Sequence, residues 1–400
     1  MIKILIYVFI IMIILTIFKS LVRIKNSYLY LKRYANYDCR KSKISKKITV
    51  IIPVYNEKNN ISKSINYFKK LSNICNVIYV TTEKEKTNDT YKKIIRCIDK
   101  YKTNNIMVVN CPNIYGTMAT QLNFACKELK DDDIIAIYNI DSFPDKRTFY
   151  YVSNRIGDDC VFQQVSFFDD DRKGILGSAQ HWQNRWSLIY EIGKYLSTSK
   201  IEFKYTIGHG LFLKKSILEK YGYWNDSEIN EDNEFGYRLI INNVRIKPIP
   251  FLEQAGFAKT KSIYIKQQST WVNGPLYAFS YYRNNKKNLK NFLITLLNFK
   301  AFLSWWLFPT ISLIFLILSL LIDFKIFIFM LALLVVYVSI FNYFAWIILR
   351  KTKCIKNSQY NTNIFNDLIF FLVHSFGAYI TIYKIIIGKN TISNKYNTEK

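Results

Sequence analysis

Two clusters of acidic side chains have the types and spacing that catalysis needs. In the first, Asn139 and Asp141 follow the apolar run 134–138, which predicts a carboxylate at the C-terminal end of a strand. Ligands of open α/β sheets bind at that end of the strands. In the second, about ninety residues later, Glu231 and Asp232 are adjacent acids at the start of a helical segment. One acid that holds a metal-bound diphosphate and another that takes a proton would together serve sugar transfer from a nucleotide sugar.

The elements that position these acids alternate between strands and helices. Runs rich in apolar and β-branched residues predict strands at residues 48–54, 76–82, 106–109, 134–138 and 160–165. Apolar stripes at helical spacing predict intervening helices at residues 61–71, 91–98 and 118–129. This alternation indicates βαβ units and a largely parallel sheet. After the fifth strand we expect an aromatic helix over about 178–198, a glycine-rich turn and the helix of Asp232.

Apolar segments outside this region predict membrane helices. Residues 301–322 and 326–349 carry no charge, and each could cross the ~30 Å hydrocarbon core as a helix of about 20 residues. Residues 4–18 are shorter, but flanking lysines could reach the interfaces, and the absence of a small-residue cleavage site favours an uncleaved anchor. Polar groups interrupt residues 366–388, which are predicted either to span the membrane or to lie at its surface.

The net charge of +27 is unevenly distributed. Residues 1–47 hold 11 basic and 1 acidic side chain, residues 261–400 hold 16 and 3, and residues 48–260 hold 29 and 25. The excess lies beside the apolar segments, as the positive-inside rule predicts. A nucleic-acid-binding domain would instead carry it on the folded region, so we expect no nucleic-acid partner. The basic residues after the first span place residues 24–290 in the cytoplasm, in a multi-pass protein of the cell membrane.

The cysteines and histidines limit the other kinds of site. Seven cysteines with no CxxC spacing are typical of reduced thiols in a cytosolic domain. Three histidines argue against a zinc site built on histidine.

Five short motifs, in order, resemble those of the family 2 glycosyltransferases, which have the GT-A fold. They are an opening strand and loop (51–57), a glycine-to-"ALN" helix (Gly116, Ala119, Leu122, Asn123), a DxD counterpart (139–141), an "ED" motif (231–232) and a QxxRW counterpart (267–271). The similarity runs from about residue 48 to 271 and is flanked by predicted spans. The sequence is similar to membrane polysaccharide synthases of the cellulose, hyaluronan and chitin synthase type. This resemblance implies a Rossmann-like α/β GT-A domain.

The resemblance implies that the loop after the first strand holds the base and ribose of a nucleotide sugar. These contacts would fall to Pro53, Tyr55 and Glu57, although Glu57 is equally compatible with a solvated loop acid. Many members have an Asp pair after the next strand, where this chain has Thr81-Thr82-Glu83. Thr82 could still offer a hydroxyl there, and a UDP-sugar is the expected donor.

Asp141 is the candidate metal ligand, because a hard carboxylate oxygen beside a diphosphate suits Mg²⁺ or Mn²⁺. Its partner in the motif is Asn139 and not Asp, so the site carries one negative charge fewer. It would bind the metal weakly, or with help from Asp145 or from the substrate. The alternative role for Asp141 is a helix N-cap.

Asp232 is the candidate general base, because an acceptor hydroxyl attacks well only when its proton is removed. Glu231 is its neighbour in the catalytic motif, but adjacent helical residues diverge by about 100°, so only one can face the sugar. The resemblance implies inversion of the anomeric centre. The alternative is that both acids simply favour the positive end of the helix dipole.

Two segments are candidates for acceptor binding. Gly208 and His209 resemble the family's glycine-containing acceptor loop, where His209 could touch the acceptor or the diphosphate, and a structural turn is the alternative. Gln267 and Trp271 keep the ends of QxxRW, and Trp271 could stack beneath a sugar. Thr270 stands in place of the arginine that, by resemblance, helps processive synthases to hold the chain.

The sequence therefore predicts an inverting, metal-dependent glycosyltransferase acting on a polysaccharide (as in cell-wall synthesis) or lipid-linked acceptor. A non-processive transferase to a polyprenyl-phosphate or lipid, and a catalytically silent membrane scaffold, remain as alternatives. The predicted order is an anchor (1–22), a basic linker (23–47), the GT-A domain (48–274), an interfacial segment (275–299), a transmembrane hairpin (300–349), a basic cytoplasmic loop (350–365), the segment 366–388 and a tail (389–400).

Overall fold

The computed structural model describes residues 2–39, 43–199, 201–356 and 359–391. The chain divides into two compact units. The sheet unit comprises residues 34–166 and 204–255, and the helical unit comprises residues 1–33, 167–203 and 256–400. Most of the predicted tail, 389–400, lies outside the described residues.

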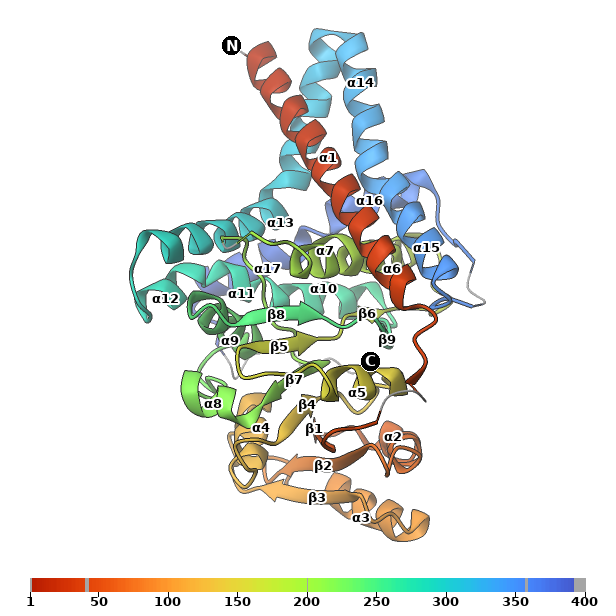
Figure 1. Ribbon diagram of the computed structural model, residues 1–400. Helices are drawn as coiled ribbons and strands as arrows, with labels where there is room; N and C mark the ends of the chain where they lie inside the picture. Colours follow the sequence, from red (N-terminus) through yellow and green to blue (C-terminus); the bar gives the residue numbers. More distant parts are fainter. Residues whose placement is uncertain (1, 40–42, 200, 357–358, 392–400) are drawn as a thin grey trace. The chain divides into compact units, whose positions relative to one another are not determined.

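A seven-stranded sheet forms the centre of the sheet unit (Figure 1). Its strands are β1 (Ile48–Pro53), β2 (Cys75–Thr82), β3 (Ile106–Cys111), β4 (Ile134–Ile137), β5 (Cys160–Gln163), β7 (Leu211–Lys214) and β8 (Arg245–Pro248). They are ordered β3-β2-β1-β4-β7-β5-β8; β1 to β4 are parallel where they pair, and β7 is antiparallel to both β4 and β5. The predicted mostly parallel sheet is confirmed, and all five predicted strands are present.

The core of the sheet unit lies between the sheet and its helices. These are η2 (Lys58–Asn60), α2 (Ile61–Lys69), α3 (Asp89–Tyr101), α4 (Met118–Cys126), α5 (Lys146–Ser153), α8 (Lys215–Tyr221) and α9 (Glu231–Ile241). On α2, the stripe Ile61, Ile65 and Phe68 is fully buried, as its spacing predicts. It packs in one cluster with alternate residues of β1, including Val50 and Ile52. Each such side chain contributes about 1.5–3 kcal/mol of hydrophobic stabilisation.

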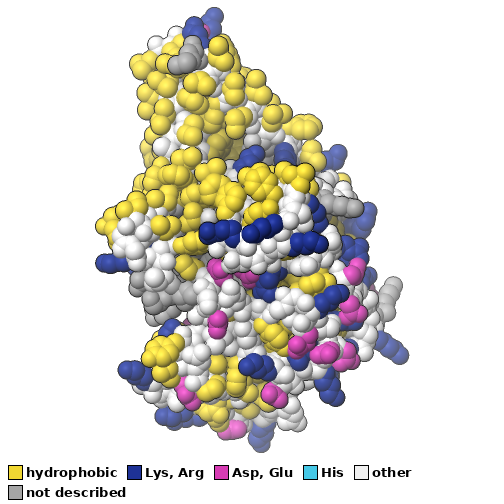
Figure 2. All heavy atoms as spheres, turned by 90° about the vertical axis from the view of Figure 1, so that its left-hand side faces the viewer, with side chains coloured by type: hydrophobic (Ala, Val, Ile, Leu, Met, Phe, Trp, Pro, Cys, Tyr) yellow, Lys and Arg dark blue, Asp and Glu magenta, His cyan; other side chains and the backbone are white. Residues whose placement is uncertain are grey.

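Four helical segments of the helical unit are long and apolar enough to cross a membrane, counted over the described ranges. They are α1 (Ile2–Tyr34), α13 (Leu289–Ile322), Phe324–Lys351 (α14, Phe324–Val335; the π-helix η4, Val336–Ile340; α15, Phe341–Lys351) and Ile364–Ile386 (α16, Ile364–Val373; α17, Phe376–Ile386). Hydrophobic side chains gather over this unit (Figure 2). Among them, Leu15, Phe18 and Leu321 are more than half exposed. An apolar surface of this extent indicates a membrane protein.

The remaining helices of this unit are α6 (Gly174–Trp186), the π-helix η3 (Ser187–Ile192), α7 (Gly193–Tyr195), α10 (Lys261–Trp271), α11 (Asn273–Leu276) and α12 (Ala278–Arg283). The chain passes from the sheet unit into the helical unit within β6 (Ser166–Phe167).

Three predicted domain boundaries differ from the structure. The first helix does not end near residue 22 but continues to Tyr34, so the first part of the predicted linker 23–47 is helical. The predicted domain 48–274 is not continuous, because residues 167–203 and 256–274 belong to the helical unit. In the predicted interfacial segment, 275–299, α13 already begins at Leu289.

Candidate active site

The carboxyl ends of the parallel strands bring the predicted nucleotide-binding residues to one edge of the sheet. Pro53 at the end of β1 pairs with Val80 of β2, and Ile51 pairs with Ile137 at the end of β4. Thr82, Asn139 and the residues that follow each strand therefore lie along the same edge. This is the edge at which α/β sheets bind ligands.

Thr82 has a structural role at this edge. Its hydroxyl donates to the Asn113 carbonyl at 2.9 Å and accepts from the Lys84 amide at 3.3 Å, and the residue is only 2% exposed. A Cβ on Gly116 would lie 3.4 Å from the Thr82 hydroxyl and 3.1 Å from the Asn113 carbonyl. These contacts use the one proton of the hydroxyl to hold the loop of Gly116. Thr82 is therefore a poorer candidate for a base contact than the sequence suggested.

The opening loop after β1 presents its polar side chains to solvent. Tyr55 is half-buried, and the Lys84 ammonium lies 5.3 Å from the centre of its ring. Glu57 is exposed at the start of η2. Both positions are open to a nucleotide, and Glu57 also has the exposure expected of a solvated loop acid.

Two amide side chains of α4 hold the edge together. Gln121 donates to the carbonyls of Val54 and Val80, at 3.1 and 2.6 Å, and so joins the ends of β1 and β2. Asn123 exchanges two hydrogen bonds with the backbone of Trp224, at 2.8 and 3.1 Å. Asn123 belongs to the "ALN" motif, and it connects α4 to the segment that leads into α9. Sequence reasoning did not identify Gln121.

The turn that carries the candidate metal ligand is closed by its own hydrogen bonds. The Asn139 amide donates to the Ser142 hydroxyl at 3.2 Å, and the Ser142 amide donates to the Asn139 carbonyl at 3.1 Å. Asp141 lies inside this turn and is half-buried. The helix N-cap is Asp145, whose carboxylate accepts from the Arg147 amide at 2.9 Å and pairs with the Arg147 guanidinium at 2.6 Å. The N-cap alternative for Asp141 is therefore wrong, and the Asp145 carboxylate is already engaged.

The donor set suits a hard divalent ion that shares its ligands with a substrate. In the described ranges, no three His, Cys, Asp or Glu side chains are grouped to hold a metal. Asp141 and Asn139 instead provide a carboxylate and an amide oxygen at the strand edge. Mg²⁺ and Mn²⁺ keep several waters and use phosphate oxygens, so this sparse set fits them.

The two adjacent acids at the start of α9 differ in exposure. Glu231 is buried, at 6% exposed, whereas Asp232 is half-buried. The Thr206 hydroxyl donates to the Asp232 carbonyl at 2.5 Å, and a Cβ on Gly208 would lie 3.4 Å from Asp232 Oδ2. The loop before β7 therefore runs directly beside the Asp232 carboxylate. Of the two acids, Asp232 is the one that a substrate can reach.

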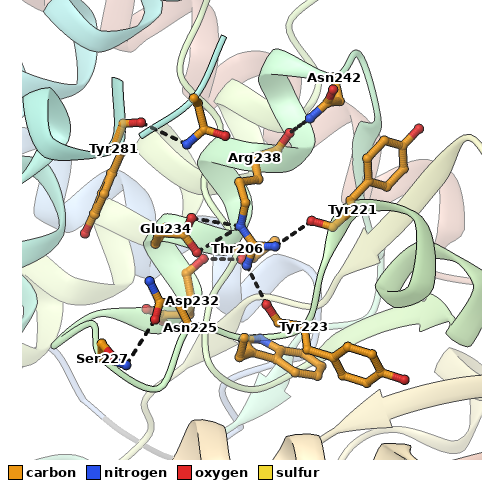
Figure 3. A network of polar contacts seen from close by, with 12 residues as sticks. Thr206, Tyr221, Tyr223, Asn225, Ser227, Asp232, Glu234, Arg238, Asn242 and Tyr281 are labelled. Carbon is orange, nitrogen blue, oxygen red and sulfur yellow. Dashed lines mark hydrogen bonds and ion pairs between the residues drawn. The ribbon is translucent and has the colours of Figure 1, made fainter. Parts of the chain in front are cut away.

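An ion pair on the same helix holds α9 in place (Figure 3). Arg238 Nε donates to both carboxylate oxygens of Glu234, at 2.8 and 3.0 Å. The same guanidinium donates to the carbonyls of Tyr221 and Tyr223, at 2.6 and 2.7 Å. Figure 3 shows Arg238 between these groups, with Asp232 nearer the start of the same helix. Glu234 thus has a structural role, which leaves Asp232 as the candidate base of the helix.

The loop 207–210 is clamped to the ends of two strands. Gly210 donates to the Ile137 carbonyl and accepts from the Gln164 amide, both at 2.7 Å. The Gln163 side chain donates to the His209 carbonyl at 2.8 Å and accepts from the Ile207 amide at 2.9 Å. Since β7 is antiparallel to β4, this loop lies at the strand edge that leads to Asp141. Gln163 and Gln164 were not singled out from the sequence, although paired polar residues at the end of a buried strand are a usable signal.

Tyr138 fixes the same region from beneath. Its hydroxyl donates to the Gln164 side chain, and the Gln164 amide nitrogen donates to the Phe251 carbonyl at 2.8 Å. Burial first, and next the charge of Glu253, raise the pKa of Tyr138 well above its usual value. The hydroxyl therefore stays protonated, and a donor, at any physiological pH.

We expect Gly210→Ala to destabilise the sheet unit by at least about 2 kcal/mol. The backbone of Gly210 is left-handed, and an added Cβ would clash with neighbouring atoms. Its φ is +66°, and a Cβ would lie 2.7 Å from the Gln164 carbonyl oxygen. Gly174→Ala is the matched control, since its φ is +56° with nothing within 4 Å. Thermal unfolding in detergent measures both. Equal shifts in Tm would contradict the steric part of this prediction.

The two remaining predicted acceptor residues lie on α10 of the helical unit. Gln267 is 6% exposed and Trp271 is 41% exposed. α17 packs closely on this helix. A Cβ atom added to Gly377 would lie only 2.6 Å from the Cβ of Gln268, and the Thr381 hydroxyl donates to the Ser269 carbonyl at 2.7 Å. Trp271 therefore keeps an exposed ring, as a stacking platform needs, while Gln267 is part of the packing.

Comparison with known proteins agrees with this architecture. Residues 49–222 match the family described as "Glycosyl transferase family 2", and residues 154–349 match "Glycosyl transferase family group 2". The chain is 23% identical over 275 residues to the probable glycosyltransferase YdaM of Bacillus subtilis, covering 66% of this chain. It spans 63% of the length of that curated relative.

A solved structure shares the fold. It is the mannosyltransferase PcManGT from Pyrobaculum calidifontis in complex with GDP-Man and Mn²⁺, with a TM-score of 0.55 and 14% identity. The likeness covers 94% of this chain and 98% of that one. The predicted GT-A fold is confirmed. The chain belongs to the family 2 glycosyltransferases.

Proposed function

We propose that the protein is an inverting, metal-dependent glycosyltransferase that moves a sugar from a nucleotide sugar to an acceptor hydroxyl at the membrane. The observation that carries the proposal is the arrangement of the sheet edge. The clamped loop 207–210 is bonded to the strand that leads to Asp141 and runs beside Asp232. A diphosphate-binding group and a proton acceptor are thus held by rigid neighbouring elements, as displacement at a sugar carbon requires.

The steps follow from the residues at this edge. Asp232 takes the proton of the acceptor hydroxyl while its oxygen forms the new bond to the anomeric carbon. The bond to the diphosphate breaks on the opposite face, its electron pair leaves with the diphosphate, and the anomeric centre inverts. Asp141, with Asn139 beside it, would hold the Mg²⁺ or Mn²⁺ ion whose charge neutralises the departing diphosphate.

The donor and acceptor are proposed from chemistry and likeness. We expect a UDP-sugar, and GDP-sugars are tested beside it because PcManGT is in complex with GDP-Man. The four apolar helices support an acceptor at a membrane, either a growing polysaccharide or a lipid-linked sugar. The basic residues in the last turns of α1 and α15 support a cytoplasmic sheet unit, where nucleotide sugars are made. Thr270, in place of an arginine, favours single additions as the second candidate.

The experiment is release of nucleoside diphosphate by full-length protein in detergent, against a panel of UDP- and GDP-sugars with Mg²⁺ or Mn²⁺. Lipid extract is supplied as a source of acceptors. We expect metal-dependent release from one donor. The length of the product, read by mass spectrometry, separates a synthase from a single-sugar transferase. Silence from every donor, together with no binding of any nucleotide, would favour a membrane scaffold.

A further inference from the structure

His209, in the loop that runs beside Asp232, is in contact with Glu253. His209 Nδ1 lies 3.2 Å from Glu253 Oε2, and the two side chains are 19% and 0% exposed. Glu253 belongs to β9 (Glu253–Gln254), and its amide donates to the Val165 carbonyl at 3.0 Å, just beyond β5. Two separate strand segments therefore position this pair.

The burial of Glu253 makes a cationic partner favourable. A carboxylate withdrawn from water needs a cation and hydrogen-bond donors, because an uncompensated buried charge costs several kcal/mol. The described residues give Oε1 no hydrogen-bond donor, and Oε2 is beside the imidazole. A protonated His209 compensates this charge. The pair thus favours the imidazolium over the neutral ring.

The charges around His209 are mixed. From α9, Asp232 lies beside the adjoining Gly208, and after β4 comes Asp141 at the same edge. The end of β5 and the residue after it contribute Gln163 and Gln164, which are uncharged, and α4 contributes the apolar Met118. The imidazolium is therefore a cation placed among the acids of a site that must receive a doubly charged diphosphate.

We propose that Glu253 is a positioning residue that holds His209 as an imidazolium, and that His209 donates a hydrogen bond to the diphosphate of the donor. This inference rests on the proposed function and adds the group that meets the leaving side of the reaction. His209 keeps its proton throughout: the electron pair of the broken bond stays on the diphosphate, and the acceptor proton goes to Asp232. A charge-assisted hydrogen bond to phosphate is among the stronger interactions of this kind.

The test compares binding of UDP and UMP to the full-length protein in Mn²⁺, since only UDP carries the second phosphate. We expect His209→Gln to weaken UDP binding about tenfold while UMP binding changes less than twofold. Glu253→Gln should weaken UDP binding in the same selective way. The double variant should lose no more affinity for UDP than His209→Gln alone. Glu253→Asp keeps the charge with a shorter reach, and should retain part of the selectivity. If the wild type binds GDP and not UDP, GDP and GMP replace the pair.

The controls separate the possible failures. Glu219→Gln removes an exposed acid of the sheet unit and should leave both affinities unchanged. If the His209 and Glu253 variants lost affinity equally for UDP and UMP and also had a lower Tm, the pair would only support the fold. That result would overturn the inference. Additive losses in the double variant would show that Glu253 does not act through His209. A wild type that binds no nucleotide would refute the proposed function itself.

Discussion

Asp232→Asn is expected to reduce the rate of sugar transfer by about 10²–10⁴-fold, because an amide cannot accept the proton of the acceptor hydroxyl. Donor binding should remain, since Asp232 is placed to act on the acceptor and not on the nucleotide. Asparagine also keeps the size of the side chain and its acceptor for the Asn233 amide, now at 2.7 Å. The fold of α9 should therefore survive the change.

Nucleotide release under saturating donor, with donor binding measured on the same preparation, gives the answer. Asp226→Asn is the matched control, because it makes the same chemical change at an exposed position a few residues earlier. It should leave the rate unchanged. If Asp232→Asn retains more than about a tenth of the wild-type rate while Glu231→Gln abolishes it, the base is Glu231 and the exposure argument is wrong.

The sheet and its ligand-binding edge could be predicted because their signals are local. Val50 and Ile52 in β1, and the Ile61, Ile65 and Phe68 stripe of α2, each carry the period of their own element. Parallel strands then bring their carboxyl ends to one edge whatever the detailed packing. Asp141 consequently follows the end of β4, as the sequence predicts.

The division into units could not be predicted in the same way. An aromatic stripe on a helix looks alike whether it is covered by a sheet or by other helices, so the sequence does not show that residues 178–198 belong to the helical unit. The structure places Trp182 in a cluster with Tyr337 and Phe371 of the helical unit. Such pairings depend on contacts between residues more than a hundred positions apart. They leave no periodic trace in the sequence.

The residues that support the site were missed for a related reason. Gln163 and Glu253 each act on the loop of His209 from a distant part of the chain. A glutamine at the end of one strand and a glutamate in a short one look like ordinary polar positions. Their function becomes visible only when burial and hydrogen-bond partners are known, because a 0% exposed carboxylate requires an explanation that an exposed one does not.

Asp141→Asn is expected to remove the metal dependence of nucleotide binding, because it takes away the carboxylate at the turn after β4. In Mn²⁺ the affinity for UDP should fall by at least about tenfold, to the value measured with EDTA. Sugar transfer should fall with it. Calorimetric titration of UDP with and without Mn²⁺ measures the effect directly, without requiring a known acceptor.

Asp145→Asn is the variant that makes this result specific to the turn. It makes the same acid-to-amide change four residues later, where the side chain caps α5 and pairs with the partly exposed Arg147. Asparagine is also a good N-cap, and an ion pair of that exposure contributes about 0–1 kcal/mol, so the fold should hold. Metal-dependent binding should be unchanged. The reverse outcome, with metal dependence lost in Asp145→Asn and kept in Asp141→Asn, would mean that the ion recruits Asp145 away from Arg147 and that Asp141 is not its ligand.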